Sequence, residues 1–227
     1  MKALLIGASG TIGKAVDYLL TKQGFTLIGA SRSTQPSVDF TSLASIDAFY
    51  EQIGELDAIL LIGGDAAFAP LDQLTDSQIE LTLASKLMGQ INMARRGIAR
   101  LRPNGVLVMT GGMLAYAPWP ATSMVAMVNA GLEGFVRAAA LDMTLGRRLV
   151  IVHPPLVAET AGLFGLDGTS YPTAATVAQS YLEAVESGRN GTAVFVSGYA
   201  PASDSGLSNK NADDQDSRDF SLTNYTI

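Results

Sequence analysis

The chain of 227 residues contains no cysteine and only one histidine, His153. Without cysteine it forms no disulfide and offers no thiolate as a nucleophile. A zinc site built from cysteine and histidine is therefore excluded, and we expect no bound metal. Charged residues are also scarce, at 16% against 48% hydrophobic residues. This composition favours a folded domain with a buried core over a disordered chain.

Positive charge is in shorter supply than negative charge, because 15 lysines and arginines face 21 acidic residues, for a net charge of −6. This balance argues against a general nucleic-acid binder and against a protein that binds membranes through basic residues. Residues 204–227 contain five aspartates against Lys210 and Arg218, so this short segment carries −3, half of the total. The acidity therefore belongs in large part to the C-terminal end.

Long apolar runs are missing as well. No run approaches the roughly 18 residues that span a membrane. The apolar residues 3–6 near the N-terminus are too few for the core of a signal peptide. We therefore expect a cytoplasmic protein.

Short apolar runs alternate with helical patterns along the chain. Strands are predicted at residues 2–6, 25–30, 57–62, 106–110, 149–153 and 192–197, and helices at 12–22, 42–53, 75–101, 123–145 and 173–187. Residues 103–105 are predicted as a turn. Such alternation is typical of an α/β fold: a doubly wound parallel sheet of Rossmann type, in three layers and one domain. We assign this domain to residues 1–200 and predict a polar, acidic, poorly ordered tail at 201–227.

A glycine-rich turn connects the first strand to the first helix. It places Gly7, Gly10 and Gly13 three residues apart, with Ser9, Thr11 and Ile12 between them. Glycine permits the tight bend, the close approach of a pyrophosphate and the packing of the helix on the strand. The N-terminus of the helix then favours phosphate groups. The motif indicates a dinucleotide site, and the alternative is a merely structural turn.

The end of the second strand bears on the choice of cofactor. A site for NAD usually has an acidic residue there, but this chain has Ser31, Arg32 and Ser33. A guanidinium can pair with a 2′-phosphate, which favours NADP(H). The alternative is that Arg32 is a solvated loop charge.

Four further segments resemble motifs of the short-chain dehydrogenase/reductase family. They are Val38-Asp39, residues 61–64 (LIGG), residues 129–135 (NAGLEGF) and residues 153–157 (HPPLV). The resemblance implies that Asp39 lies near the adenine, that Gly63 and Gly64 border the cofactor and that Pro154 lies beside the nicotinamide. It also implies a homodimer or homotetramer, and a small lid over the substrate at residues 158–172.

The catalytic residues of this family are absent from their expected positions. By the resemblance, the catalytic tyrosine falls on Val125, the lysine on Asn129, the asparagine on Lys86 and the serine near Gly111 or Gly112. No lysine occurs between Lys86 and Lys210, so this region cannot contain the family's Tyr-x-x-x-Lys motif.

Lys86, Asn129 and Tyr116 are the candidate replacements. Lys86 and Asn129 together could hold the ribose of the nicotinamide, and Tyr116 could bring a phenol to the site. The alternatives are a lysine that reaches solvent and a tyrosine packed beside Trp119. The leading hypothesis is an NADP(H)-dependent oxidoreductase with a non-standard active site and a small carbonyl or alcohol substrate. The alternatives are a non-catalytic NADP(H)-binding sensor or partner-binding protein, and another reaction on the same fold.

Overall fold

The computed structural model describes residues 1–201 and the backbone of Tyr225–Thr226. Its centre is a parallel sheet of six strands in the order β2-β1-β3-β5-β6-β7. The strands are β1 (Lys2–Ile6), β2 (Thr26–Ala30), β3 (Leu56–Leu61), β5 (Leu101–Thr110), β6 (Arg148–His153) and β7 (Ala193–Phe195). All six lie where the sequence predicts strands, which confirms the doubly wound α/β fold.

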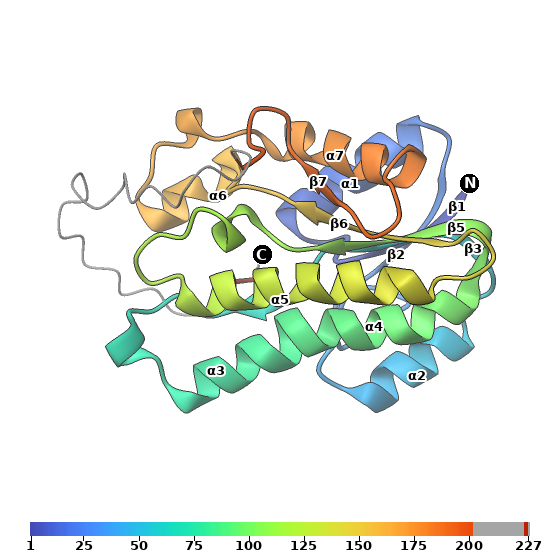
Figure 1. The fold of residues 1–227 in the computed structure, drawn as a ribbon, viewed down its shortest axis with the longest axis horizontal. Helices are drawn as coiled ribbons and strands as arrows, with labels where there is room; N and C mark the ends of the chain where they lie inside the picture. Colours follow the sequence, from blue (N-terminus) through green and yellow to red (C-terminus); the bar gives the residue numbers. More distant parts are fainter. Residues whose placement is uncertain (202–224, 227) are drawn as a thin grey trace.

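Helices cover both faces of this sheet (Figure 1). One face packs against α1 (Thr11–Lys22) and α7 (Ala174–Glu186), and the other against α2 (Leu43–Glu51), α4 (Gln90–Gly97) and α5 (Ser123–Ala139). Alternate strand residues supply the two cores: Leu4 and Ile6 face α2, while Ala3 and Leu5 face α1. Because both faces are buried, the central stretches of β1, β3, β5 and β6 are apolar, as is typical of a parallel sheet.

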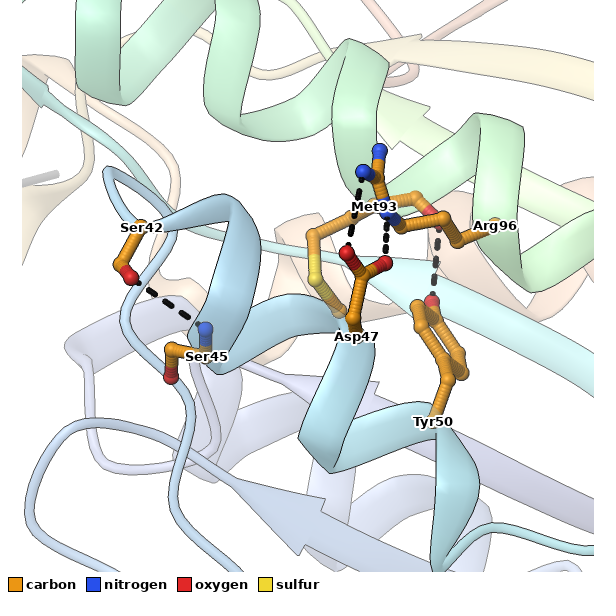
Figure 2. Close-up of polar contacts among 6 residues, drawn as sticks. All are labelled: Ser42, Ser45, Asp47, Tyr50, Met93 and Arg96. Carbon is orange, nitrogen blue, oxygen red and sulfur yellow. Dashed lines mark hydrogen bonds and ion pairs between the residues drawn. The ribbon is translucent and has the colours of Figure 1, made fainter.

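Polar contacts tie α2 to α4 on one face of the sheet (Figure 2). The Tyr50 hydroxyl donates to the carbonyl of Met93 at 3.0 Å, and Asp47 pairs with Arg96 at the surface. Ser42 caps α2 by accepting a hydrogen bond from the Ser45 amide. These contacts hold α4, and with it the segment that precedes it, in a fixed place on the sheet.

The predicted helix at residues 75–101 is interrupted. Thr75 and Gln78 form the expected capping box at the start of α3 (Asp76–Thr82). The middle of the segment is then a π-helix, η2 (Leu83–Gly89), before α4 and the short 3-10 turn η3 (Ile98–Arg100). Helix propensity and apolar spacing do not encode this change of hydrogen-bond pattern. π-Helical turns often mark functional positions.

The predicted turn at residues 103–105 lies within the bounds of β5. The strand pairs Leu101 with Leu56 and resumes at Val106 with Ala58, so residues 102–105 are an insertion in the ladder, of which 102–104 are exposed. Asn104 adopts a positive φ of 63° there. The predicted turn is therefore present, but it interrupts β5, whereas the sequence placed it before the strand.

The lid predicted at residues 158–172 contains the short helix α6 (Ala158–Ala161) and the 3-10 turns η6 (Gly162–Phe164) and η7 (Gly168–Ser170). Phe164 contacts Phe68 and Trp119 at ring-centre distances of 5.1 and 6.3 Å. Of the predicted tail, residues 202–224 and 227 lie outside the described residues. The strand β8 (Tyr225–Thr226) pairs in antiparallel fashion with β4 (Asp65–Ala66).

One segment corrects the expectation about apolar runs. Within the described residues, Ser123–Asp142 is long and apolar enough, by length and composition alone, to cross a membrane, with a mean hydropathy of 1.3. The segment has no unbroken apolar run, and its hydropathy is high because small and apolar residues are spread along it with few charges. Here the segment forms α5 and the turn η5 (Ala140–Asp142), and its inner face packs on the sheet.

Candidate functional site

A cavity of about 320 Å³ opens where β2, β1 and β3 end. Its walls come from the loops that follow these three neighbouring strands. The chain leaves β1 toward β2 on one side and returns to β3 on the other, and such a switch point is where doubly wound sheets bind ligands. The lining residues are Gly7, Ser9, Gly10, Ser85 and residues 31–33, 38–41 and 62–65.

Glycine is required in the first of these loops. Gly7 has a φ of +88°, and a Cβ there would lie 1.7 Å from the carbonyl oxygen of Ile62. A Cβ on Gly13 would lie 2.0 Å from the carbonyl oxygen of Gly7. The turn is therefore pressed between the end of β3 and the first turn of α1, and no side chain fits at either position.

The N-terminus of α1 lies at this turn and has free hydrogen-bond donors. Gly10 is the residue before the helix, and no side chain of the described residues caps it. The first N–H groups of an α-helix have no acceptor within the helix, and the helix dipole adds positive potential there. The arrangement fits phosphate groups, so the residues present suit the dinucleotide that the sequence motif predicts.

Arg32 stands at the rim of the cavity. One of its guanidinium nitrogens lies 3.4 Å from Oδ2 of Asp65, which lines the opposite wall. The Arg32 side chain is 64% exposed and the Asp65 side chain 14%. Arg32 is thus a wall residue with an acidic partner, in contrast to the alternative of a purely solvated loop charge.

Lys86 lies on η2, behind the wall that Gly64 forms. A Cβ on Gly64 would lie 2.7 Å from the Lys86 Cα, so the glycine lets η2 approach the end of β3. Lys86 is fully buried, and its Nζ has no hydrogen-bond partner among the described residues. Burial lowers the pKa of its ammonium group to about 8. The alternative that Lys86 reaches solvent is therefore wrong.

Asn129 occupies the space beside the end of β5. Its Oδ1 is buried and has no partner in the described part of the chain. A Cβ on Gly112 would lie 2.6 Å from the Asn129 Nδ2, and a Cβ on Gly111 would lie 2.5 Å from Cε1 of His153. At the two positions where the resemblance places a catalytic serine, a side chain would therefore require the Asn129 amide or the His153 ring to move.

Tyr116, Glu133 and His153 form a polar network next to Asn129. The Tyr116 hydroxyl donates to Oε2 of Glu133, and His153 Nε2 lies 3.3 Å from the same oxygen. On the other side of the ring, the Gly112 amide donates to His153 Nδ1 at 3.0 Å. Nδ1 also lies 3.2 Å from the Gly112 carbonyl oxygen, so the ring is held between the Gly112 backbone and Glu133.

The network also sets two pKa values. The contact with His153, followed by that with Tyr116, lowers the pKa of Glu133 below its usual range. Burial, together with the bond to Glu133, raises the pKa of Tyr116. Tyr116 therefore keeps its proton at neutral pH and acts as a hydrogen-bond donor to a carboxylate.

Most of the residues predicted to bind the cofactor line the cavity. They are Gly7, Ser9, Gly10, Ser31, Arg32, Ser33, Asp39, Gly63 and Gly64. Asp39 shapes the 38–41 turn by accepting hydrogen bonds from the amide and hydroxyl of Thr41. Thr11, Ile12, Gly13, Lys86 and Pro154 do not line it. The first three form the first turn of α1, and Pro154 is buried after β6, where its carbonyl accepts a hydrogen bond from Met113.

Sequence analysis missed Asp65, Ser85 and Glu133. Asp65 follows directly on Gly63-Gly64, and its amide hydrogen bonds to Oγ of Ser85 at 2.9 Å. Glu133 lies four residues after Asn129, one helical turn further on the same face of α5. This i,i+4 spacing was a usable signal for Glu133, whereas the contact of Asp65 with Arg32 depends on the sheet order.

Comparison with known families finds similarity to proteins described as reductases. A family model described as enoyl-(acyl carrier protein) reductase matches residues 32–196. A hydroxynaphthalene reductase-like protein, Arp2, of Metarhizium brunneum is 23% identical over 175 residues, which cover 66% of this chain and 65% of the relative. The NADPH-dependent 1-acyldihydroxyacetone phosphate reductase of Saccharomyces cerevisiae is 23% identical over 164 residues, 62% of this chain and 55% of the relative. The chain thus spans less than two thirds of the length of these curated relatives.

Solved structures share the fold of this chain. The protein lin1944 of Listeria innocua is 37% identical, with a TM-score of 0.82 over 86% of this chain and 99% of the other. A short chain dehydrogenase of Burkholderia cenocepacia, solved in complex with NADP, is 24% identical, with a TM-score of 0.75 over 86% and 95% of the two chains. Since the family model covers more than half of the chain, we conclude that the chain belongs to the short-chain dehydrogenase/reductase family.

Proposed function

We propose that this chain is an NADP(H)-dependent oxidoreductase with a non-standard active site that acts on a small carbonyl or alcohol substrate. The observation that carries the proposal is the cavity at the switch point of the sheet, with the uncapped N-terminus of α1 at its base and Arg32 at its rim. This arrangement suits a pyrophosphate below and a 2′-phosphate above. The relatives named for NADPH or solved with NADP support the same choice of cofactor.

Lys86 and Asn129 would hold the ribose beside the nicotinamide. The buried ammonium of Lys86 is a hydrogen-bond donor without a partner in the described chain. The Asn129 Oδ1 is a buried acceptor that also has no partner there. A ribose hydroxyl both accepts and donates, so a diol would satisfy the two groups together. The nicotinamide itself supplies the hydride chemistry, and the protein binds and orients it. We assign Tyr116 a positioning role, because its hydroxyl is bound to Glu133.

A non-catalytic NADP(H)-binding sensor is the second candidate. Two observations favour it. The region between Lys86 and Lys210, where the family has its catalytic motif, contains no Tyr-x-x-x-Lys. The expected serine positions are glycines, Gly111 and Gly112, pressed against the side chains of His153 and Asn129. The cofactor cavity is compatible with both candidates, so only turnover separates them.

The test combines binding with turnover. NADPH and NADH are titrated into the protein by fluorescence, and oxidation is then followed over a panel of small carbonyl compounds. We expect NADPH to bind more tightly than NADH, and turnover on at least one compound. Tight binding without turnover on any compound would favour the sensor, and no binding of either cofactor would overturn both candidates.

Lys86→Ala tests the replacement of the catalytic lysine. We expect NADPH affinity to fall by about tenfold, because the variant loses a charge-assisted hydrogen bond to the ribose. Lys22→Ala, at the exposed end of α1, is the matched control and should leave affinity unchanged. Equal affinity in Lys86→Ala and the parent chain would remove Lys86 from the cofactor site.

The assembly proposed from the family resemblance is a homodimer or homotetramer that pairs through the helix predicted at residues 75–101 and its neighbour, here α4 and α5. The segment Ser123–Asp142 is apolar, yet only 39% of its window is buried. Met88 on η2 and Met127 on α5 are 42% and 47% exposed. An apolar face of this kind suits a second copy of the chain. Light scattering should give a multiple of the 23.7 kDa chain mass, and a monomeric mass would contradict the assembly.

A further inference from the structure

We propose that the Arg32–Asp65 ion pair is a bar across the mouth of the cofactor site, and that cofactor binding must break it. Asp65 then acts as an internal competitor of the cofactor's phosphate for the Arg32 guanidinium. The inference rests on the proposed NADP(H) site and adds a residue that limits affinity there.

The order of the strands supplies the first argument. Arg32 follows β2 and Asp65 follows β3, while β1 lies between these two strands in the sheet. A link from Arg32 to Asp65 therefore passes over the end of β1, where Gly7 and Gly10 form the phosphate turn. Both partners line the same cavity as that turn. A dinucleotide bound on the turn would occupy the space that the ion pair crosses.

The position of Asp65 supplies the second argument. Its backbone is fixed, because its amide donates to Oγ of Ser85 and β4 pairs with β8 at this residue. Its side chain is only 14% exposed, whereas that of Arg32 is 64% exposed. Arg32 is thus the mobile partner: its long side chain can leave a fixed carboxylate and turn to another anion.

Charge supplies the third argument. A phosphate gives Arg32 a replacement for the carboxylate, with more acceptor oxygens. Asp65, once released, is a negative group beside a bound anion and opposes it. Both effects make Asp65 unfavourable to cofactor binding. If Asp65 instead held Arg32 in place for the phosphate, its removal would weaken binding, so the sign of the effect decides between the two roles.

Asp65→Asn in the full chain is the test, because asparagine keeps the shape of the side chain and removes its charge. NADPH and 2′,5′-ADP are titrated by calorimetry, and the second ligand carries the 2′-phosphate without the nicotinamide. We expect both to bind about two- to fivefold more tightly than to the parent chain, the range that a partly exposed ion pair allows. In the Arg32→Ala background, the same substitution should change affinity by less than half as much.

Asp72→Asn is the matched control, because Asp72 is an exposed acid on η1 (Leu71–Gln73), outside the cavity. It should leave both affinities unchanged. Unchanged or weaker binding in Asp65→Asn, while the parent chain binds both ligands, would overturn the inference that the ion pair opposes cofactor binding, and would leave the proposed function standing. Failure of the parent chain to bind either ligand would overturn the proposed function, and with it the inference about the Arg32–Asp65 ion pair.

Discussion

The cavity at the ends of β2, β1 and β3 and the region at the ends of β5 and β6 are built in different ways. At the end over β1, the backbone does the shaping: Gly7 and Gly13 leave no room for a side chain, and the N–H groups of α1 provide the donors. At the end beside β5 and β6, buried side chains fill the space, and Lys86 and Asn129 each have a buried polar atom without a hydrogen-bond partner in the described chain. At the end over β1, the groups suited to bind phosphate are therefore mostly backbone atoms, which do not depend on the identity of a side chain.

This difference would account for a glycine turn that matches the family beside a side-chain region that, by the resemblance, departs from it. The phosphate turn is made of backbone atoms. Substitutions at other positions therefore leave it intact, provided that its glycines are kept. A side-chain site changes its chemistry whenever a residue changes, and the resemblance places Lys86 and Asn129 where the family has asparagine and lysine. Binding of the phosphates and the identity of the reaction can therefore diverge on one fold.

Gly7→Ala should produce the largest effect, because it breaks the phosphate turn of the cavity. The added Cβ would meet the Ile62 carbonyl oxygen at 1.7 Å, at a φ of +88°. We expect the free energy of unfolding to fall by about 4 kcal/mol, from overpacking and backbone strain together. Urea unfolding measures the loss.

Gly24→Ala separates these two causes. Gly24 also has a positive φ, +81°, but a Cβ there meets nothing within 4 Å. Its substitution should cost only about 1–2 kcal/mol, the strain of the left-handed backbone. Equal losses in the two variants would show that close approach contributes nothing at the phosphate turn.

Lys86→Met tests the side-chain end through the pH dependence of stability. The pKa of Lys86 is about 8 in the folded chain against 10.5 for the free group, so the unfolded chain binds more protons between these pH values. The penalty of burying the charge is fully present below pH 8 and is relieved as the pH rises toward 10.5. The parent chain should therefore gain about 3 kcal/mol over this range relative to Lys86→Met.

The measurement compares urea unfolding of both chains at pH 7 and pH 10. Methionine is close to lysine in volume and carries no charge, so the other titrating groups cancel in the difference. At pH 7, Lys86→Met should be the more stable chain. Parallel profiles in the two chains would mean that Lys86 is not an uncompensated buried charge.

The fold and the phosphate turn were predictable because each depends on local pattern. Apolar runs and glycine spacing placed the six strands and the turn, and the capping box at Thr75 marked the start of α3. The π-helical turn at η2 was not predictable, because its hydrogen bonds depend on packing between Gly64 and Lys86. The Arg32–Asp65 contact likewise required the sheet order, since 33 positions separate the two residues in the chain.

Tyr116→Phe should produce the smallest effect and sharpens the description of the side-chain end. The variant loses one hydrogen bond to Glu133, but His153 remains beside that carboxylate at 3.3 Å. We expect a loss of about 1 kcal/mol in the free energy of unfolding, the usual value of one such bond. If Tyr116 only positions Glu133, turnover should stay within a few-fold of the parent chain on any substrate that the panel reveals. A loss of turnover of 100-fold or more, with stability unchanged, would instead place the phenol at the reacting atoms, since general acid catalysis contributes about 10²–10⁴-fold.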